Sequence, residues 1–453
     1  MRITVHPGGK IGGETRVPGD KSIAHRWLIL AATARGRSEL RGLPAALDVV
    51  STARVLAAMT PERPRAALEL WTARSLQRAE HHGSTTNDSD PRARSIILEG
   101  GGRANLHAPD GDLNCGNSGT TMRLVSGVLA SQAFEARLVG DASLSTRPME
   151  RIAQPLREMG ADVETTGGLP PVTVHGGPLA GIRHATVVPS AQIKGAVLLA
   201  ALDAEGETTV VEPARTRDHT ERALEHLGAP VRVEGLAVAV SRFEHRGFAG
   251  SVPGDVSSAA FLIAAAVLTG GTLRIDDVGL NPSRTHLLGI LRRMGVPIDA
   301  EIERQELGEP VGTIVVEATG RLSGATVSAE ELPLVIDEVP VLAMLSATAA
   351  GDSRFRGAAE LRVKESDRLR AIEHAIHSLG GDARIEGDEL VVAGGGLRGG
   401  SASSGADHRL AMAIAVGGLG AGGPVTVDGI EAADVSFPGF VRTLSALGAR
   451  LEP

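Results

Sequence analysis

The chain has 453 residues, enough for two or three domains of ordinary size, and 42% of them are apolar, so a large buried core is available. Its net charge of −8 and its 2% of aromatic residues exclude a typical nucleic-acid binder, which needs positive charge and stacking rings. One cysteine excludes an internal disulfide framework and is typical of a cytoplasmic protein.

The first residues predict a strand rather than a targeting or membrane segment. Ile3, Thr4 and Val5 are β-branched, and the apolar stretch of a signal peptide is missing. The longest apolar run, residues 259–268, has ten residues, whereas a membrane span needs about 20. We therefore expect no membrane contact.

One pattern recurs along the chain: a helix-like run that ends in Leu-Gly or Met-Gly. Its glycines follow one another at offsets of 68, 67, 85 and 68 residues, and they are Gly160, Gly228, Gly295, Gly380 and Gly448. A sixth run, near residues 56–59, has no glycine. Glycine after the last turn is typical of a helix end, and periods of this size indicate one repeated supersecondary unit.

Each copy predicts the same succession of elements. An apolar helix (residues 261–268, for example) leads through a glycine turn to a short strand (272–275) and then to an amphipathic helix (284–294). Helices that alternate with short strands indicate the α/β class, and a helix that is apolar on all sides must be buried. We expect three units to bury their apolar helices together, so that six units make two lobes.

Two further features bear on the organisation of the chain. The tetrad Val-Pro-Gly-Asp at residues 17–20 recurs at 252–255, and we interpret both as crossing points between the lobes. Residues 60–95 interrupt the first repeat: 66–82 predict a helix that carries Leu68, Trp71 and Leu76, and polar residues 83–90 predict disorder. A tolerated surface insertion is the simpler interpretation, and a partner-binding arm is the alternative.

Charged residues are concentrated where the apolar helices are expected to begin. Lys21, Ser22 and Arg26 follow the turn at residues 18–20. Helix N-termini attract anions, so these cations predict a phosphate or carboxylate site, with a solvated helix start as the alternative. The segment is not a P-loop, because Asp20 separates the glycine from the lysine.

The other repeats carry comparable groups at the same place. In the first half these are Gly119, where a ligand could approach the backbone closely, Arg147, and Ser190-Ala191-Gln192. An ordinary N-cap is the alternative interpretation for the Gly119 segment. In the second half they are Asp337, Lys364, Glu365, Arg368 and Arg409, and Lys364 and Arg368 would share one face if their segment is helical. Convergence of these groups predicts a positive cleft for a small molecule with several negative charges.

Several of these strings occur together in one known family. They are Pro-Gly-Asp-Lys-Ser-Ile-x-His-Arg (18–26), Asn-Ser-Gly-Thr-Thr-Met-Arg (117–123), Ser-Ala-Gln-Ile-Lys (190–194), Val-Lys-Glu-Ser-Asp-Arg (363–368) and Asp-His-Arg (407–409). From about residue 3 to 453, apart from the insertion, the chain resembles the 5-enolpyruvylshikimate-3-phosphate synthase (3-phosphoshikimate 1-carboxyvinyltransferase) family.

The resemblance implies both a fold and a reaction. The fold is a two-lobe inside-out α/β barrel of six βαβαββ units, with residues 21–251 in one lobe and 1–20 plus 252–453 in the other. In the reaction, phosphoenolpyruvate donates its enolpyruvyl group to the 5-hydroxyl of shikimate 3-phosphate and phosphate leaves, a step of the shikimate pathway to chorismate and the aromatic amino acids. It also implies no cofactor and no metal, and we expect a monomer.

The resemblance further assigns roles to residues. Lys21 would contact both substrates and act in catalysis with Asp337, the base for the hydroxyl, and Glu365, the acid for the methylene carbon. Shikimate 3-phosphate would be held by Lys21, Ser22, Arg26, Ser190, Ala191, Gln192, Asp337 and Lys364. Phosphoenolpyruvate would be held by Lys21, Gly119, Arg147, Gln192, Arg368 and Arg409.

Three positions depart from the best-known pattern of the family. Glu360 stands in place of Asn, Thr216 in place of Tyr, and Val435 in place of Lys. Loss of that lysine weakens the phosphoenolpyruvate site, and Lys194 and Arg217 are the candidates to compensate.

Two other functions stay open. UDP-N-acetylglucosamine enolpyruvyl transferase has the same fold but uses a cysteine acid in a flexible Gly-Cys loop, whereas Cys115 is interpreted as a small structural residue. A non-catalytic phosphate-ester binding paralogue is the other, and the presence of both Asp337 and Glu365 argues against it.

Overall fold

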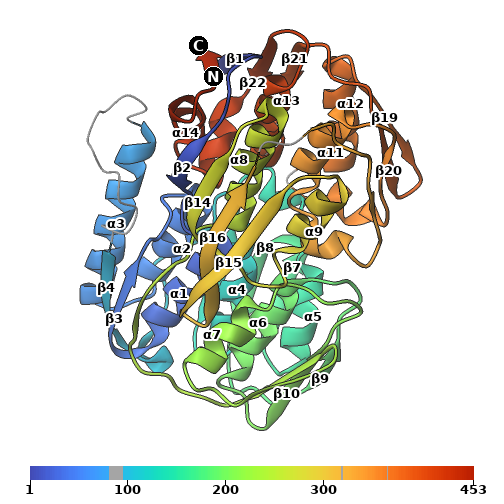
Figure 1. The fold of residues 1–453 in the computed structure, drawn as a ribbon. Coiled ribbons are helices and arrows are strands. Elements are labelled where there is room, and N and C mark those ends of the chain that lie inside the picture. Colours follow the sequence, from blue (N-terminus) through green and yellow to red (C-terminus); the bar gives the residue numbers. More distant parts are fainter. Residues whose placement is uncertain (81–94, 318–319, 365) are drawn as a thin grey trace. The chain divides into compact units, whose positions relative to one another are not determined.

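The computed structural model describes residues 1–80, 95–317, 320–364 and 366–453, and shows a mixed α/β protein (Figure 1). The chain divides into two compact units. Unit 1 contains Met1–Pro18, Pro253–Arg304 and Pro310–Pro453, and unit 2 contains Gly19–Val252 and Gln305–Glu309. Two of the changes from one unit to the other fall inside the two Val-Pro-Gly-Asp tetrads.

Unit 2 combines helices with three small sheets. The helices are α1 (Lys21–Thr33), α2 (Leu47–Ala57), α3 (Glu62–Glu80), α4 (Gly119–Leu129), α5 (Glu150–Glu158), α6 (Ala191–Ala201) and α7 (His219–His226). The sheets have the orders β13 (Ala249–Ser251), β3 (Arg35–Arg41), β4 (Ser95–Gly101); β5 (Leu113–Asn114), β6 (Glu135–Val139), β8 (Leu169–His175), β7 (Asp162–Thr166); and β9 (Arg183–Ala185), β10 (Glu207–Val211), β12 (Ala237–Ser241), β11 (Val231–Glu234).

Unit 1 repeats this arrangement. Its helices are α8 (Val256–Thr269), α9 (His286–Arg293), α10 (Leu332–Val335), α11 (Val339–Thr348), α12 (Arg368–Ser378), α13 (His408–Leu419) and α14 (Phe440–Ala446). The sheet orders are β2 (Gly13–Arg16), β14 (Leu273–Gly279), β16 (Glu309–Val316), β15 (Ile298–Glu306); β17 (Thr326–Val327), β18 (Ser353–Phe355), β20 (Glu389–Ala393), β19 (Asp382–Glu386); and β21 (Gly400–Ser403), β22 (Val425–Asp428), β1 (Arg2–His6), β23 (Arg450–Glu452). The ends of β15 and β16, at Gln305–Glu309, group with unit 2.

The repeated Leu-Gly or Met-Gly step is the point where an amphipathic helix turns into a strand. The five glycines have φ between 75° and 114°, a region that favours glycine, and β7, β11, β15, β19 and β23 follow them. After the sixth run, at the end of α2, the helix α3 follows instead, and its sheet has only β13, β3 and β4 among the described residues. The missing glycine therefore marks a repeat without this strand.

The apolar helices form the core of each unit, as predicted. In unit 1, α8 and α11 each pack against α13, and in unit 2, α4 packs against α6 and α1. Their starts carry polar groups: the side chains of Asp20, Ser118, Ser190, Asp255 and Asp407 each accept a hydrogen bond from a backbone N–H of the following helix. The sequence thus places polar and charged side chains at the N-termini of buried helices.

The insertion begins with a real helix. α3 runs from Glu62 to Glu80, buries Leu68 and Trp71, and packs on α2 and β4, which confirms the predicted helix and moves its start four residues earlier. The disorder predicted for residues 83–90 concerns residues outside the described ranges. Every helix in the part of the chain that the structure describes is too short or too polar to cross a lipid bilayer.

Candidate active site

The start of α1 places Lys21, a predicted site residue, among polar groups. Asp20 accepts a bond from the N–H of Ile23 (3.0 Å), which fixes the first turn of the helix. Lys21, the first residue of α1, has its Nζ atom 2.8 Å from Oδ2 of Asp48, and Asp48 lies in the first turn of α2. The Lys21 side chain is 14% exposed, so its ammonium group is mostly desolvated but can still be reached by a ligand.

Arg26, one turn later, joins three segments of unit 2. Its Nε donates to Oγ1 of Thr220 (2.7 Å), its Nη1 to the carbonyl of Ser22 (2.8 Å) and its Nη2 to the carbonyl of Ala191 (3.4 Å). Predicted residues from the starts of α1 and α6 are therefore in direct contact. Arg26 is only 3% exposed, so its charge stands in a region of low dielectric.

Burial at the start of α1 shifts two pKa values. Burial lowers the pKa of Arg26 to about 10, although the carboxylate of Glu221 opposes the shift. Burial, and then the charges of Lys21 and Arg26, hold the pKa of His25 well below its usual value. Arg26 stays charged and His25 stays neutral at pH 7, so the start of α1 carries the cations that an anionic ligand requires.

A second group lies where α4 and α6 begin. Arg123 donates through Nη1 to Oε1 of Gln192, and Gln192 donates through Nε2 to Oγ1 of Thr120 (2.8 Å). A Cβ atom on Gly119 would lie 3.1 Å from Nη1 of Arg123 and 3.5 Å from Nη1 of Arg147. Two guanidinium groups therefore flank a backbone position without a side chain, which suits close approach of a carboxylate or phosphate.

In unit 1 a carboxylate stands between two guanidinium groups. Oδ1 of Asp337 lies 3.4 Å from Nη1 of Arg368, and Oδ2 lies 3.6 Å from Nη2 of Arg409. Asp337 precedes α11, Arg368 begins α12 and Arg409 is the second residue of α13. The arginines are 1% and 4% exposed and the Asp337 side chain is 17% exposed, so the carboxylate is the more accessible group.

One expectation for this segment is wrong. Lys364 and Arg368 do not share a helical face, because a 3₁₀ helix ends at Val363 and α12 begins only at Arg368. Asp367 separates them: its side chain accepts from the N–H of Arg370 (3.2 Å) and so starts a new helix. Glu365, the expected acid, lies outside the described residues.

Sequence reasoning assigned no role to three residues of these groups. Asp48 contacts Lys21, Arg123 contacts Gln192, and Asp407 accepts from Nε of Arg368 (2.7 Å). Two of them had usable signals: Arg123 lies four residues after Gly119 on the expected helix, and Asp407 occupies an N-cap position. Nothing in the sequence pairs Asp48 with Lys21.

Lys194 is not available as a substitute cation, contrary to expectation. Its Nζ lies 2.6 Å from Oε2 of Glu212 and 2.6 Å from Oε1 of Glu221, and all three side chains are buried. Thr216, one of the departures from the family pattern, donates to Glu212. Two carboxylates already balance the lysine, so only Arg217 stays a candidate.

Cys115 has the character of a structural residue. It is fully buried, and its thiol contacts the carbonyl of Leu113 (Sγ to O 3.7 Å). Burial raises the pKa of the thiol to about 12, so the group is protonated at neutral pH and shielded from solvent. This environment differs from that of an acid in a flexible loop.

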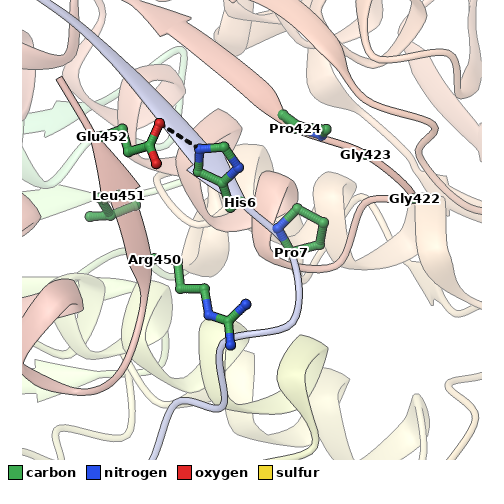
Figure 2. Close-up of a pocket in the computed structure, with 8 residues that line it drawn as sticks. All are labelled: His6, Pro7, Gly422, Gly423, Pro424, Arg450, Leu451 and Glu452. Atoms are coloured by element: carbon green, nitrogen blue, oxygen red, sulfur yellow. Dashed lines mark ion pairs between the residues drawn. The ribbon is translucent and has the colours of Figure 1, made fainter.

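Two other features of the surface lie apart from the predicted residues. A pocket of about 590 Å³ is lined by ends of β1 and β23 and the turn at Gly422. Figure 2 shows two of its lining residues, His6 and Glu452, in direct contact (Nε2 to Oε2 3.1 Å). Asp162, Glu164 and His175 have ligand atoms within 4.8 Å of one another. Exposed groups of this kind are common without a metal, so they do not support one.

The fold and these groups define a class: an α/β protein in which buried helices begin with cations suited to a small, multiply charged anion. Comparison with known proteins identifies the family. The family model of EPSP synthase (3-phosphoshikimate 1-carboxyvinyltransferase) matches residues 5–88 and 83–444. The chain belongs to this family.

Similar proteins match over nearly the whole length. Proteins named 3-phosphoshikimate 1-carboxyvinyltransferase are 42% identical in Desulfitobacterium hafniense (98% of this chain, 97% of the relative) and 42% identical in Alkalilimnicola ehrlichii (100% and 96%). The structure of EPSP synthase from Acinetobacter baumannii has a TM-score of 0.80 at 37% identity and covers both chains completely.

Proposed function

We propose that this chain transfers the enolpyruvyl group of phosphoenolpyruvate to the 5-hydroxyl of shikimate 3-phosphate and releases phosphate. The observation that supports the assignment most directly is the carboxylate of Asp337 between Arg368 and Arg409, because a base beside two phosphate- or carboxylate-binding cations is what the reaction needs. Family membership supports the same reaction.

We assign the shikimate ester to residues at the starts of α1 and α6, together with two residues of unit 1. Lys21, Ser22, Arg26, Ser190, Ala191 and Gln192 are the residues from unit 2, and Asp337 and Lys364 are those from unit 1. The contact of Arg26 with the carbonyl of Ala191 supports a common site for the first set. Arg26 would supply the fixed charge for the phosphate group.

Phosphoenolpyruvate carries a phosphate and a carboxylate, so it needs several cations. We assign it to Lys21, Gly119, Arg147, Gln192, Arg368 and Arg409, and we add Arg123 because it flanks Gly119 and holds Gln192. Preorganised guanidinium groups stabilise the charge on the departing phosphate without having to reorient.

The proton transfers follow from this assignment. Asp337 takes the proton of the 5-hydroxyl while the oxygen bonds to the substituted carbon of phosphoenolpyruvate, and Glu365 gives a proton to the methylene carbon. Glu365, now a carboxylate, then takes a methyl proton back, so that the double bond is restored as the carbon–oxygen bond to phosphate breaks, and the departing phosphate takes the proton held by Asp337. We further propose the two-lobe inside-out barrel, with lobes of residues 21–251 and of 1–20 plus 252–453, and a monomeric protein.

A phosphate-release assay with purified protein tests this function. We expect release from phosphoenolpyruvate only when shikimate 3-phosphate is present, with one equivalent of the enolpyruvyl ether of shikimate 3-phosphate formed per phosphate. Release that is independent of the shikimate ester, or that requires UDP-N-acetylglucosamine, would contradict the proposal. Binding of both substrates without release would instead indicate the non-catalytic paralogue.

A further inference from the structure

Buried carboxylates stand at the starts of the three core helices of unit 1. They are Asp255 at α8, Glu338 at α11 and Asp407 at α13, and each is at most 4% exposed. Arg368 bridges Asp407 and Asp337 and belongs to the proposed site. Arg284, in the turn before α9, is 2% exposed and has no part in the proposed chemistry.

Arg284 bridges the carboxylates at the starts of α8 and α11, as Arg368 bridges Asp337 and Asp407 near the starts of α11 and α13. Its Nη2 atom lies 3.5 Å from Oδ1 of Asp255 and 3.5 Å from Oε1 of Glu338. The same Nη2 donates to Oγ of Ser257, and Ser257 in turn donates to Oε1 of Glu338. Arg284 therefore reaches Glu338 both directly and through a hydroxyl group.

The side chain and the backbone carbonyl of Glu338 both accept hydrogen bonds. Its side chain is fully buried in the contact with Ser257 and Arg284, and its carbonyl accepts from the N–H of Leu342 (3.0 Å), which starts α11. A charge-assisted contact of this kind in a buried region allows little freedom to the residue that makes it.

The adjacent residue is the proposed base. Asp337 is one peptide unit from Glu338, so their Cα atoms are about 3.8 Å apart, yet its carboxylate lies against Arg368 and Arg409 rather than Arg284. Fixing Glu338 therefore fixes the direction in which Asp337 leaves the backbone.

We propose that Arg284, Ser257 and Glu338 are positioning residues, which hold the turn before α11 so that Asp337 faces its substrate. The inference rests on the proposed function, because it concerns the same base. It goes beyond that function by assigning a catalytic effect to buried groups that touch no substrate.

Three substitutions each remove one part of the Arg284–Ser257–Glu338 contact. Ser257→Ala removes the bridging hydroxyl, Glu338→Gln keeps shape but removes the charge facing Arg284, and Arg284→Met removes the guanidinium group. We expect kcat to fall by about 10- to 100-fold in the last two and by less in the first, because small misplacement of a catalytic group has effects of this size. KM for phosphoenolpyruvate, which Asp337 is not proposed to hold, should change by less than about threefold.

Arg103 offers a matched control for loss of a buried guanidinium group. Its Nε donates to Asp203 (2.8 Å) and its Nη2 to the carbonyl of Leu202 (3.2 Å), within unit 2, and it is 7% exposed. Arg103→Met should lower the thermal unfolding temperature but leave kcat of the folded protein within about twofold of wild type. A similar fall in kcat for Arg103→Met would overturn the proposal.

Combination with Asp337→Asn separates positioning from general damage. If Arg284 and Glu338 act through Asp337, adding either substitution to Asp337→Asn causes no further fall in kcat. A further fall of the full size, or unchanged kcat in all three single variants, would overturn the inference. Should Arg284→Met be too unstable to purify, Glu338→Gln and Ser257→Ala decide the question. Wild-type release that depends on both substrates preserves the proposed function in either case.

Discussion

Arg368 and Asp407 form a buried two-bond contact. Nε of Arg368 donates to Oδ2 of Asp407 (2.7 Å) and Nη2 donates to Oδ1 (3.3 Å), and the same Oδ1 accepts from the N–H of Arg409 (2.9 Å). A single carboxylate thus caps α13 and orients a guanidinium group toward Asp337.

Removing that carboxylate should be costly for stability. We expect Asp407→Asn to lower the free energy of unfolding by about 3–5 kcal/mol, because it leaves a buried arginine with its main counter-charge removed. Urea unfolding followed by circular dichroism measures the change. The exposed pair of Arg137 and Asp112 is the control, and Asp112→Asn should have little effect. Equal losses in both variants would show that burial of the pair does not matter.

The proposed base gives the sharpest catalytic prediction. Asp337→Ala should lower turnover in the phosphate-release assay by at least about 10²-fold, the usual scale for a proton-transfer group. Asp388, exposed before β20, offers a control carboxylate whose replacement by Ala should have no effect. Turnover near the wild-type value in Asp337→Ala would remove this residue from the mechanism.

Lys21 is predicted to act on both substrates. Lys21→Met should lower kcat/KM by about 100-fold or more, because it removes a preorganised charge from a mostly desolvated site. Lys10, exposed in the same N-terminal segment, is the control, and Lys10→Met should be indistinguishable from wild type. Steady-state kinetics with each substrate varied in turn would show whether only one KM responds, which would contradict contact with both.

Cys115 should be dispensable and unreactive. Because burial raises the pKa of its thiol to about 12, the thiolate is scarce at pH 8, and the side chain is shielded. We expect iodoacetamide to leave activity unchanged in the native protein, and Cys115→Ala to retain turnover within about threefold. Rapid inactivation by the reagent, absent from Cys115→Ala, would point instead to a cysteine acid.

Stability should fall in acid partly because of His25. Its pKa in the folded protein lies well below 6.5, so the unfolded chain binds a proton first as the pH falls, and folding is disfavoured below about pH 6.5. One such group contributes a slope of about 1.4 kcal/mol per pH unit. Unfolding free energies of His25→Gln between pH 7 and 5 should show a smaller decline than wild type. An identical decline would mean that His25 binds protons equally in the folded and unfolded chains, so that folding does not lower its pKa.

Much of this architecture can be predicted from periodicity. The apolar run at residues 261–268 lies within α8, and the Leu-Gly and Met-Gly steps lie between a helix and the strand that follows it. Both features depend on local sequence, so they can be predicted. The pairing of Lys21 with Asp48 and the burial of Lys194 between two glutamates could not be predicted, since they join segments that only the folded chain brings together. The four-residue spacing of Lys364 and Arg368 suggested one helical face, but Asp367 is the N-cap of α12, so the helix begins only after Lys364.

The terminal sheet of unit 1 places the first and last strands side by side. β1 pairs with β22 and β23, with Thr4 opposite Glu452, and both ends of the chain lie at this sheet (Figure 1). Unit 1 consequently cannot be completed until translation has reached its last residues, whereas Gly19–Val252 emerges from the ribosome long before. A short peptide linking residue 453 to residue 1, with new ends opened in a surface turn, should be accepted without loss of the sheet.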